Sequence, residues 1–531
     1  MKYPSRTLSL LVAGALLVSM AGCSSNTASS SASSAAASVL AAEESTLSLA
    51  GATALTFTDS GISAAEGDYS GYAIEGTALT INAPGTYVLS GSCADGSVTI
   101  KAETEGVTLV LNGLDLTSTT TAPIVCGKST GVTIAVYGGT QNTLADTAAN
   151  DKDGTNASAD AESAVLKCKD GSQVVLCGSG TLNITAAGKN GIKSGTENEG
   201  RAASLTIREL TLNIDAPVND AINAEQTLEV ESGTLNISAG DDALHSDYTL
   251  NIGAADTAGP VITISACNEG LEGAELNIFS GTIDITATDD CLNAANGDLT
   301  DYAFSMNISG GTINAYTSGG DGLDSNGSLT ISGGNITVWT ANTADNQPLD
   351  ADGTITITGG TVLAAGGSAG MGYTIDASQG YVTYGGMGAA STVRLTNGSA
   401  FTITDASGST VYSGTALCDA NYLFYCAADL AADSEYTLAA GSTTLAAATA
   451  QTGTTRATFG GMGGGTPGMT PPDDAANGQT PPAMNGGAPG GQAPDGQGGT
   501  PPEKPAGTPS GTPPEMPAQN NATSQAEIAA G

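Results

Sequence analysis

Histidine, aromatic residues and positive charges are all scarce in this sequence, and each scarcity excludes a class of function. The 531 residues include one histidine, His245, 4% aromatics, and 14 Lys and Arg against 53 Asp and Glu, a net charge of -39. Such an acidic chain lacks the cations that nucleic-acid binding requires. A single imidazole excludes a multi-histidine zinc site and limits Ser–His–Asp or Cys–His catalysis. Carboxylates, amides and hydroxyls remain, and these are the ligands that Ca²⁺ prefers.

Paired cysteine motifs are also missing. Eight cysteines follow Cys23, none of them in a CxxC pair, and several lie within apolar runs typical of strands. We therefore expect buried free thiols rather than a disulfide framework or a zinc site.

The N-terminal residues have the features of an export signal. Lys2 and Arg6 precede the apolar run 8–20, which is too short for a permanent membrane span. Small residues stand directly before Cys23, as in a bacterial lipobox, which predicts a signal peptide over 1–23 and lipidation of Cys23. Residues 24–47, rich in Ser and Ala, would then be a tether to the extracellular face of the bacterial cell membrane. The alternative is an ordinary signal peptide that contains a cysteine.

The C-terminal segment 456–531 has a different composition. It contains 14 of the 20 prolines, with Thr-Pro-Pro recurring at 470–472, 480–482, 500–502 and 512–514. Large apolar side chains are almost absent, so the segment cannot bury enough surface to offset its chain entropy. We expect a disordered tail.

A repeat occupies the middle of the chain. Each copy is a turn with a central aliphatic residue, followed by a pair of short strands. These strand pairs include 276–285, 306–315, 329–338 and 355–364. The aliphatic residues recur 21 to 31 positions apart, and they are Ile192, Ile222, Leu244, Leu271, Leu292, Leu323 and Leu349, with fainter members at Ile124, Val165 and Ile375.

Short β-branched strands at this period, with Gly in the turns, are typical of a β-solenoid. Leucine-rich repeats would need leucine-dense blocks with helices, and a propeller needs about 40 residues per repeat. We expect an all-β solenoid of about ten rungs over 48–380, near 50 Å long at roughly 4.8 Å per rung. Residues 381–455 would add strands that cap its end, because an open edge invites aggregation.

Polar residues flank the aliphatic position of the turns. Stacked rungs bring these carboxylates about 5 Å apart, where a hard divalent cation would relieve their repulsion. The predicted Ca²⁺ ligands are Asp220, Asp242, Glu269, Asp290, Asp321, Asp324 and Asp350. The alternative is that Asp and Asn serve only as turn formers that accept hydrogen bonds from backbone amides.

Aromatic residues of the second strand suggest a sugar contact. Ile313 and Ile336 align as inward residues, which places Tyr316 and Trp339 side by side on the outer face, flanked by Asn314 and Thr337. Exposed rings of this kind stack on pyranose faces. The alternative is that the two rings only cap a rung edge or lie beneath a loop.

An ordered set of motifs is shared with a known family. These motifs are Gly85-Thr-Tyr-Val-Leu-Ser-Gly91, Gly106-Val-Thr-Leu-Val-Leu-Asn112, Gly138-Gly-Thr-Gln-Asn-Thr-Leu144, Gly178-Ser-Gly-Thr-Leu182 and Lys189-Asn-Gly-Ile-Lys193. Over roughly residues 50–455 the chain resembles the cell-surface carbohydrate-binding β-helix family of cellulose- and pectin-degrading clostridia. The resemblance implies a right-handed parallel β-helix similar to polysaccharide lyases, bound Ca²⁺, and binding of plant cell-wall polysaccharide such as cellulose or polygalacturonate. The family's Asp-Gly-Ile/Leu turn is intact only at 321–323.

Catalysis is the competing interpretation. A lyase needs Lys or Arg as base and Ca²⁺ to acidify the proton next to the uronate carboxylate. The sequence has no Lys or Arg between Arg208 and Arg394, and the nearest candidates include Lys189 and Lys193. We therefore expect a monomeric, non-catalytic polysaccharide binder, with a lyase as first alternative and a surface spacer without glycan affinity as second.

Overall fold

The computed structural model describes residues 49–456, apart from 66–69, 342–345, 368–373 and 387–392. The predicted signal peptide with Cys23, the tether and the Pro-rich residues 457–531 lie outside the described residues.

Short strands separated by turns make up nearly all of the described chain. In β16 (Thr211–Ala216) alternate side chains are buried and the others are more exposed, as expected where one face of a strand covers a core. Glycines with positive φ, such as Gly233 at 104°, occupy turns where a side chain would be strained. Within the described ranges, the one helical element is the 3-10 helix η1 (Ala148–Asn150), and no helix has the length and apolarity needed to cross a membrane.

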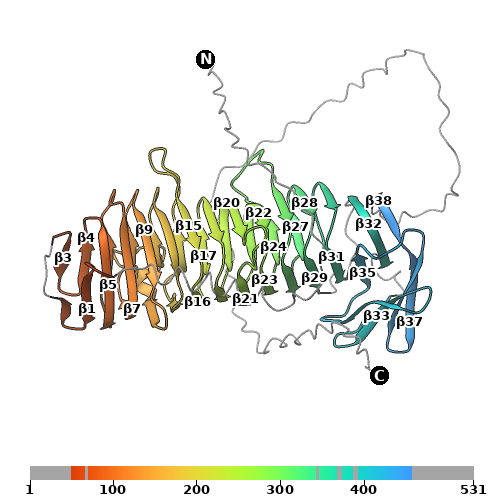
Figure 1. Ribbon diagram of the computed structural model, residues 1–531, viewed down its shortest axis with the longest axis horizontal. Coiled ribbons are helices and arrows are strands. Elements are labelled where there is room, and N and C mark those ends of the chain that lie inside the picture. The colour runs from red at the N-terminus through yellow and green to blue at the C-terminus, as the bar shows by residue number, and fades with distance from the viewer. Residues whose placement is uncertain (1–48, 66–69, 342–345, 368–373, 387–392, 457–531) are drawn as a thin grey trace, which may run out of the picture.

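The strands stack in three parallel rows, which the chain visits in turn, and so build an elongated solenoid (Figure 1). The first row contains β4 (Ala78–Ile81), β6 (Ser97–Ile100), β8 (Ile124–Cys126), β11 (Ala164–Cys168), β14 (Asn190–Ser194), β17 (Ile222–Ala224), the first parts of β20 (Leu244–Ile252) and β22 (Leu271–Ile278), β24 (Leu292–Ala294) and β27 (Leu323–Ser325).

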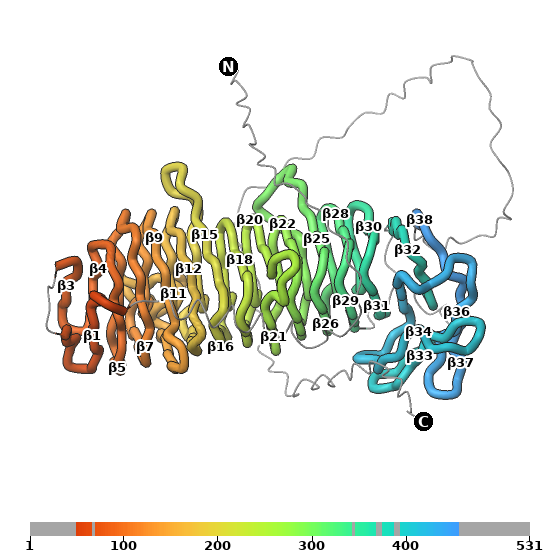
Figure 2. Tube along the Cα trace, viewed as in Figure 1, coloured from red at the N-terminus to blue at the C-terminus, as the bar shows by residue number. Residues whose placement is uncertain are grey.

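The other two rows complete each ring of strands, and Figure 2 shows the resulting coils side by side. The second row contains β1 (Thr53–Thr58), β5 (Gly85–Cys93), β7 (Val107–Ser118), β9 (Gly131–Val136), β12 (Gln173–Gly178), β15 (Ser204–Ile207), β18 (Thr227–Val230), the second parts of β20 and β22, β25 (Ser305–Ile308), β28 (Ser328–Ile331), β30 (Thr354–Ile357) and β32 (Thr374–Gly385). The third row contains the ends of β5 and β7, then β10 (Gln141–Asp146), β13 (Thr181–Thr185), β16, β19 (Thr234–Ala239), β21 (Val261–Ala266), β23 (Thr282–Ala287), β26 (Thr312–Thr317), β29 (Asn335–Thr340) and β31 (Thr361–Gly366).

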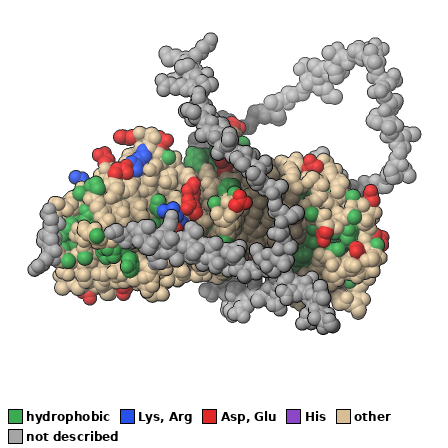
Figure 3. Space-filling view, in the orientation of Figure 1, with side chains coloured by type: hydrophobic (Ala, Val, Ile, Leu, Met, Phe, Trp, Pro, Cys, Tyr) green, Lys and Arg blue, Asp and Glu red, His purple; other side chains and the backbone are tan. Residues whose placement is uncertain are grey.

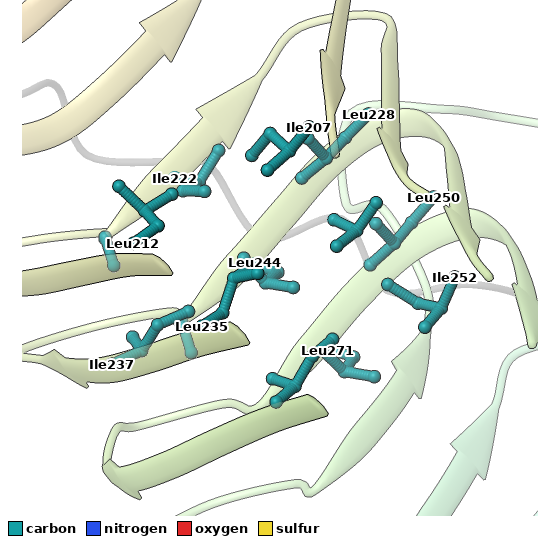
Figure 4. Packing of buried hydrophobic residues seen from close by; sticks show 14 of the residues in the cluster. Ile207, Leu212, Ile222, Leu228, Leu235, Ile237, Leu244, Leu250, Ile252 and Leu271 are labelled. Atoms are coloured by element: carbon teal, nitrogen blue, oxygen red, sulfur yellow. The ribbon is translucent and has the colours of Figure 1, made fainter. Parts of the chain in front are cut away.

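The core is one continuous cluster of aliphatic side chains that runs through the middle of the solenoid. Leu244 of the first row, Leu250 of the second and Leu235 of the third face one another across the interior (Figure 4). Each buried side chain of this size contributes roughly 1.5–3 kcal/mol, and it does so by stacking on the neighbouring coils.

The aliphatic repeat of the sequence is the register of the first row. Consecutive Cα partners are Ile192, Ile222, Leu244, Leu271, Leu292, Leu323 and, through an isolated bridge, Leu349. Two of the fainter assignments are wrong. Leu166, not Val165, pairs with Ile124, because consecutive residues of β11 are buried and the alternation that marks the register is lost there. Ile375 belongs to the second row, where it pairs with Ile355.

Antiparallel strands occupy both ends of the parallel rows. At the N-terminal end, β2 (Gly61–Ala64) pairs with β1, and β3 (Tyr72–Glu75) pairs with β4. At the other end, β35 (Tyr422–Cys426) and β38 (Gln451–Arg456) pair with β31 and β32. These pairings satisfy backbone groups that an open edge would leave exposed.

A second, smaller sheet lies in the C-terminal part. Its four antiparallel strands are β34 (Thr410–Thr415), β33 (Ala400–Asp405), β36 (Glu435–Ala440) and β37 (Thr443–Thr449). None of the eight described cysteines forms a disulfide bond and seven are buried, as the sequence led us to expect.

Candidate functional site

The outward side chains of the first row form a line of polar residues, here called the acidic ladder. The ladder position directly after each inward aliphatic residue is occupied in register by Lys167, Lys193, Asn223, His245, Glu272, Asn293 and Asp324. The turn position two residues before the aliphatic residue supplies Asn190, Asp220, Asp242, Glu269, Asp290 and Asp321. The ladder is basic toward its N-terminal end and acidic afterwards, and on the face seen in Figure 3 the basic side chains lie in the N-terminal half.

On the other two rows, outward asparagine side chains form hydrogen bonds with one another from rung to rung. Asn213 donates to Asn183 and accepts from Asn236, both at 2.8 Å, and Asn277 similarly links Asn251 and Asn307 at 3.0 Å. An amide both donates and accepts, so a line of amides needs no further ligand. Ionised carboxylates can only accept, so neighbouring carboxylates of the acidic ladder cannot compensate one another in this way.

Three carboxylates converge at the C-terminal end of the acidic ladder. One oxygen from each of Asp321, Asp324 and Asp350 lies within 4.8 Å of the others. Burial, together with the charges of neighbouring carboxylates, raises the pKa of Asp321 and of Asp324 to about 7 and also raises the pKa of Asp350. Burial and mutual repulsion therefore oppose the ionisation of these groups near neutral pH, and a bound cation would favour the ionised form.

A residue with an unpaired amide oxygen lies at the same turn as these carboxylates. The side chain of Gln347 is 7% exposed, and its Oε1 has no hydrogen-bond partner within the described chain. Its main-chain N–H donates to Asp321 Oδ1 at 2.5 Å, which places Gln347 at the same turn. The three converging carboxylates form an all-oxygen donor set, to which a residue of the same turn can add an amide oxygen, and Ca²⁺ favours such donors. The residues present fit a calcium ion.

The other predicted ligands lie along the ladder but outside this cluster. Asp290 accepts from the backbone N–H of Asp321 at 2.6 Å, and Asp220 accepts from Asn223 at 2.6 Å. Burial raises the pKa of each to about 6. Glu269 accepts from Asn293 at 2.9 Å, and burial raises its pKa to about 8. One oxygen of Asp290 thus acts as a turn former would, while its charge adds to the acidic surroundings of Asp321.

Asp242 joins a different group, together with His245 and Glu272. Burial alone would lower the pKa of His245, but hydrogen bonds with Asp242, Asp247 and Glu272 outweigh burial and raise that pKa to about 12. In the absence of a metal His245 is therefore an imidazolium at neutral pH, and it offsets part of the negative charge of this rung.

Lysines occupy the ladder on the N-terminal side of these acids. Lys193 contacts Glu225 at 3.0 Å and donates to Asn223 at 3.1 Å. Burial and the charge of Lys193 lower the pKa of Lys167. Five strand steps separate Lys193 from Asp324, which is about 24 Å at roughly 4.8 Å per step.

The predicted aromatic pair lies on the outer face but is covered. Tyr316 and Trp339 are Cα partners in β26 and β29, as the repeat alignment indicated. Trp339 is only 1% exposed, and Tyr316 is half-buried against the same cluster of C-terminal residues. The expectation that Trp339 is exposed for sugar stacking is therefore wrong, because the small C-terminal sheet packs over this face.

The polar residues expected beside these rings have partners in the protein. Asn314 donates to Asp284 at 2.8 Å. Thr337 is hydrogen-bonded to Tyr412 of the C-terminal sheet. Both side chains therefore stabilise the fold at this position.

A surface aromatic group that the sequence analysis missed lies near His245. Tyr248 and Tyr302 meet edge to face with ring centroids 6.2 Å apart, and Tyr302 lies 5.5 Å from Phe304. Tyr248 is 39% exposed and the other two rings are half-buried. We call these three residues the aromatic platform. The signal that was available is the segment 295–304, an insertion between β24 and β25 that carries two aromatic residues in three positions.

Hydrogen bonds attach this insertion to the rung that carries His245 and to the rung that follows it. Asn296 donates to the main-chain oxygen of Asp247 at 2.9 Å, and the hydroxyl of Tyr302 donates to Glu275 at 2.8 Å. The platform is therefore held beside the acidic ladder. Aromatic faces beside carboxylates and amides are the groups from which sugar-binding sites are built.

Comparison with known proteins identifies a family for the chain. A family described as carbohydrate-binding domain-containing protein matches residues 75–370 and 253–490, which together span more than half of the chain. The chain belongs to this family. A solved structure described as the polysaccharide lyase-like protein from C. thermocellum, gadolinium derivative, is similar, with 22% identity and a TM-score of 0.33 over 57% of this chain and 96% of that chain. No curated protein matches the chain.

Proposed function

We propose that this family member holds polysaccharide at the bacterial cell surface without cleaving it. Membership in a carbohydrate-binding family makes a glycan the ligand class, and the aromatic platform beside the acidic ladder is the observation that carries the proposed site. A pyranose ring stacked on Tyr248 would bring its hydroxyls within reach of the polar residues of the neighbouring rungs.

Calcium is the proposed cofactor, held by Asp321, Asp324 and Asp350 with Gln347. Ca²⁺ would supply positive charge to an acidic surface, and this chain's residues would bind and orient it. The negative net charge of the protein affects the two candidate plant cell-wall polysaccharides differently. Polygalacturonate is an anion and needs a bridging cation to approach an acidic ladder, whereas cellulose is neutral and needs only the aromatic platform.

The remaining features of the proposal follow the same reasoning. We infer a right-handed coil of about ten rungs, because parallel crossover connections are right-handed in nearly all proteins. We also propose a monomer held at the outer face of the membrane through lipidated Cys23.

A calcium-dependent polysaccharide lyase is the second candidate, and Lys167 is the observation that favours it. Burial lowers the pKa of this lysine, as a base that acts near neutral pH requires. However, base and metal must act on the same sugar residue, and about 24 Å separates the closer Lys193 from Asp324. This separation argues for binding over cleavage.

The test is a binding and product assay on the full-length protein with pectin, polygalacturonate, cellulose and hemicellulose, each with Ca²⁺ and with chelator. We expect depletion of protein from solution by at least one polysaccharide, without the ultraviolet absorbance of unsaturated uronates. Product formation would establish the lyase instead. If the protein neither binds a polysaccharide nor forms product, the remaining interpretation is a surface spacer.

A further inference from the structure

His245 is the only basic side chain on the acidic half of the ladder. No Lys or Arg occurs between Arg208 and Arg394, and the ladder positions from Asn223 onward otherwise carry amides and carboxylates. The imidazole is therefore surrounded by groups that can bind a cation, and it adds a nitrogen donor that the Asp321 cluster lacks.

Two carboxylates from adjacent rungs face the same ring nitrogen. His245 Nδ1 lies 3.1 Å from Asp242 Oδ2 and also contacts Glu272 Oε2. The three donor atoms lie within 4.8 Å of one another. The side chains are 17%, 13% and 15% exposed, in the order His245, Asp242 and Glu272, so the site is largely dry but open to a small ion.

The other ring nitrogen is held as in metal-binding histidines. His245 Nε2 lies 2.9 Å from Asp247 Oδ1, and the main-chain oxygen of Asp247 accepts a hydrogen bond from Asn296. An imidazole that binds a metal through one nitrogen usually donates its other N–H to a carboxylate, which fixes the tautomer and the ring orientation. Asp247 has this position, and it leaves Nδ1 directed at the two carboxylates.

An unpaired oxygen lies on the adjacent rung. Asn293 is the Cα partner of Glu272 and is 8% exposed. Its Oδ1 has no hydrogen-bond partner in the part of the chain that the structure describes. A buried acceptor without a partner is unfavourable unless a donor or a cation satisfies it.

We propose that Asp242, His245 and Glu272 form a binding site for a transition-metal ion of the Zn²⁺ class, distinct from the calcium site at Asp321, Asp324 and Asp350. Zn²⁺ accepts imidazole nitrogen and carboxylate oxygen together, whereas Ca²⁺ prefers oxygen alone. Three protein ligands leave one tetrahedral position for water. The inference is independent of carbohydrate binding, and a proton on His245 is the competing occupant.

Zinc titration of the full-length protein tests the proposal. After removal of metals by chelator, Zn²⁺ is titrated by calorimetry in excess Ca²⁺, which occupies oxygen-only sites. We expect saturable binding that is weakened in His245→Gln by more than the roughly 10- to 100-fold loss typical of an outer-shell partner, with Asp247→Asn falling in that range. Asp429→Asn, which removes one exposed carboxylate outside the ladder, is the matched control and should bind Zn²⁺ like the wild-type protein.

X-ray absorption at the zinc edge of the wild-type complex provides a measurement that does not depend on how the variants fold. Imidazole scattering with nitrogen and oxygen neighbours at about 2.0–2.2 Å would support the site, and a Zn–S distance of about 2.3 Å would place the metal on cysteine and overturn it. Absence of Zn²⁺ binding, or equal affinity in wild-type and His245→Gln proteins, would also overturn it and leave His245 as a fixed imidazolium.

Discussion

Trp339 and Phe401 meet edge to face, with ring centroids 5.9 Å apart and ring planes at 68°. Trp339 belongs to β29 of the solenoid and Phe401 to β33 of the small C-terminal sheet, so this contact joins the two parts. Both rings are 1% exposed. The contact therefore explains why the only tryptophan of the chain is structural.

Phe401→Ala should loosen this junction. Loss of a buried phenylalanine costs about 3–5 kcal/mol, and here it would also admit water to Trp339. We expect a red shift of tryptophan fluorescence and stronger quenching by iodide. Phe279→Ala is the matched control, because Phe279 is 38% exposed and its loss should change stability by about 0.5 kcal/mol or less. An unshifted emission in Phe401→Ala would contradict the described packing.

The aromatic platform predicts which tyrosine matters for glycan binding. Removal of the ring in Tyr248→Ala should cost about 0.5–1.5 kcal/mol of binding free energy, a roughly 2- to 12-fold weaker affinity for the polysaccharide that the protein retains. Tyr137→Ala is the control, since Tyr137 is also 39% exposed but lies far along the chain from the platform. Affinity gel electrophoresis measures both variants. Equal losses, or none, would move the sugar site elsewhere.

The fold could be predicted from the sequence because every copy of the repeat must meet the same physical requirement. An inward aliphatic residue must lie above the one before, so the spacing of Ile222, Leu244 and Leu271 already contains the register of the row. The turn acids were found for the same reason, since their position relative to the aliphatic residue fixes the edge of the solenoid on which they lie.

The sugar-facing residues could not be found in this way. Whether Trp339 is exposed depends on Phe401, which is 62 positions further along the chain and outside the repeat. The grouping of Asp242 with His245 was not predicted, because a pattern of carboxylates does not include an imidazole, although His245 occupies the ladder position shared by Asn223 and Glu272. Local periodicity identifies faces, and contacts between non-repeating segments decide which faces stay open.

Stability in chelator should fall as pH rises. The pKa values of Asp290, Asp321 and Glu269 are raised to about 6, 7 and 8, against about 4 in an unfolded chain. The folded state then binds more protons than the unfolded state, so its stability is present at low pH and is lost as pH rises through these values. His245 acts in the same direction above its ordinary pKa of 6.5.

Thermal unfolding between about pH 5 and pH 8 measures this dependence. We expect a declining Tm in chelator and a smaller decline in excess Ca²⁺, because the ion binds the ionised carboxylates. A Tm that rises with pH in chelator would mean that folding does not raise the pKa values of these carboxylates.

Stabilisation by Ca²⁺ should depend on Asp324. A ligand that binds only the folded state at 100 times its Kd adds about 2.7 kcal/mol, which appears as a higher Tm. Asp324→Asn removes one of the three converging carboxylates, so we expect the calcium-induced rise in Tm to be largely lost. The Tm in chelator should increase, because a buried charge and its repulsion with Asp321 and Asp350 are removed. Asp429 is exposed and lies outside the ladder, so Asp429→Asn removes the same charge as a control. This variant should keep the full calcium-induced rise in Tm. If both variants respond to Ca²⁺ like the wild-type protein, the converging carboxylates do not hold the ion. These opposite changes in chelator and in calcium separate a metal site from a set of turn-forming aspartates, because turn formers would lose stability under both conditions.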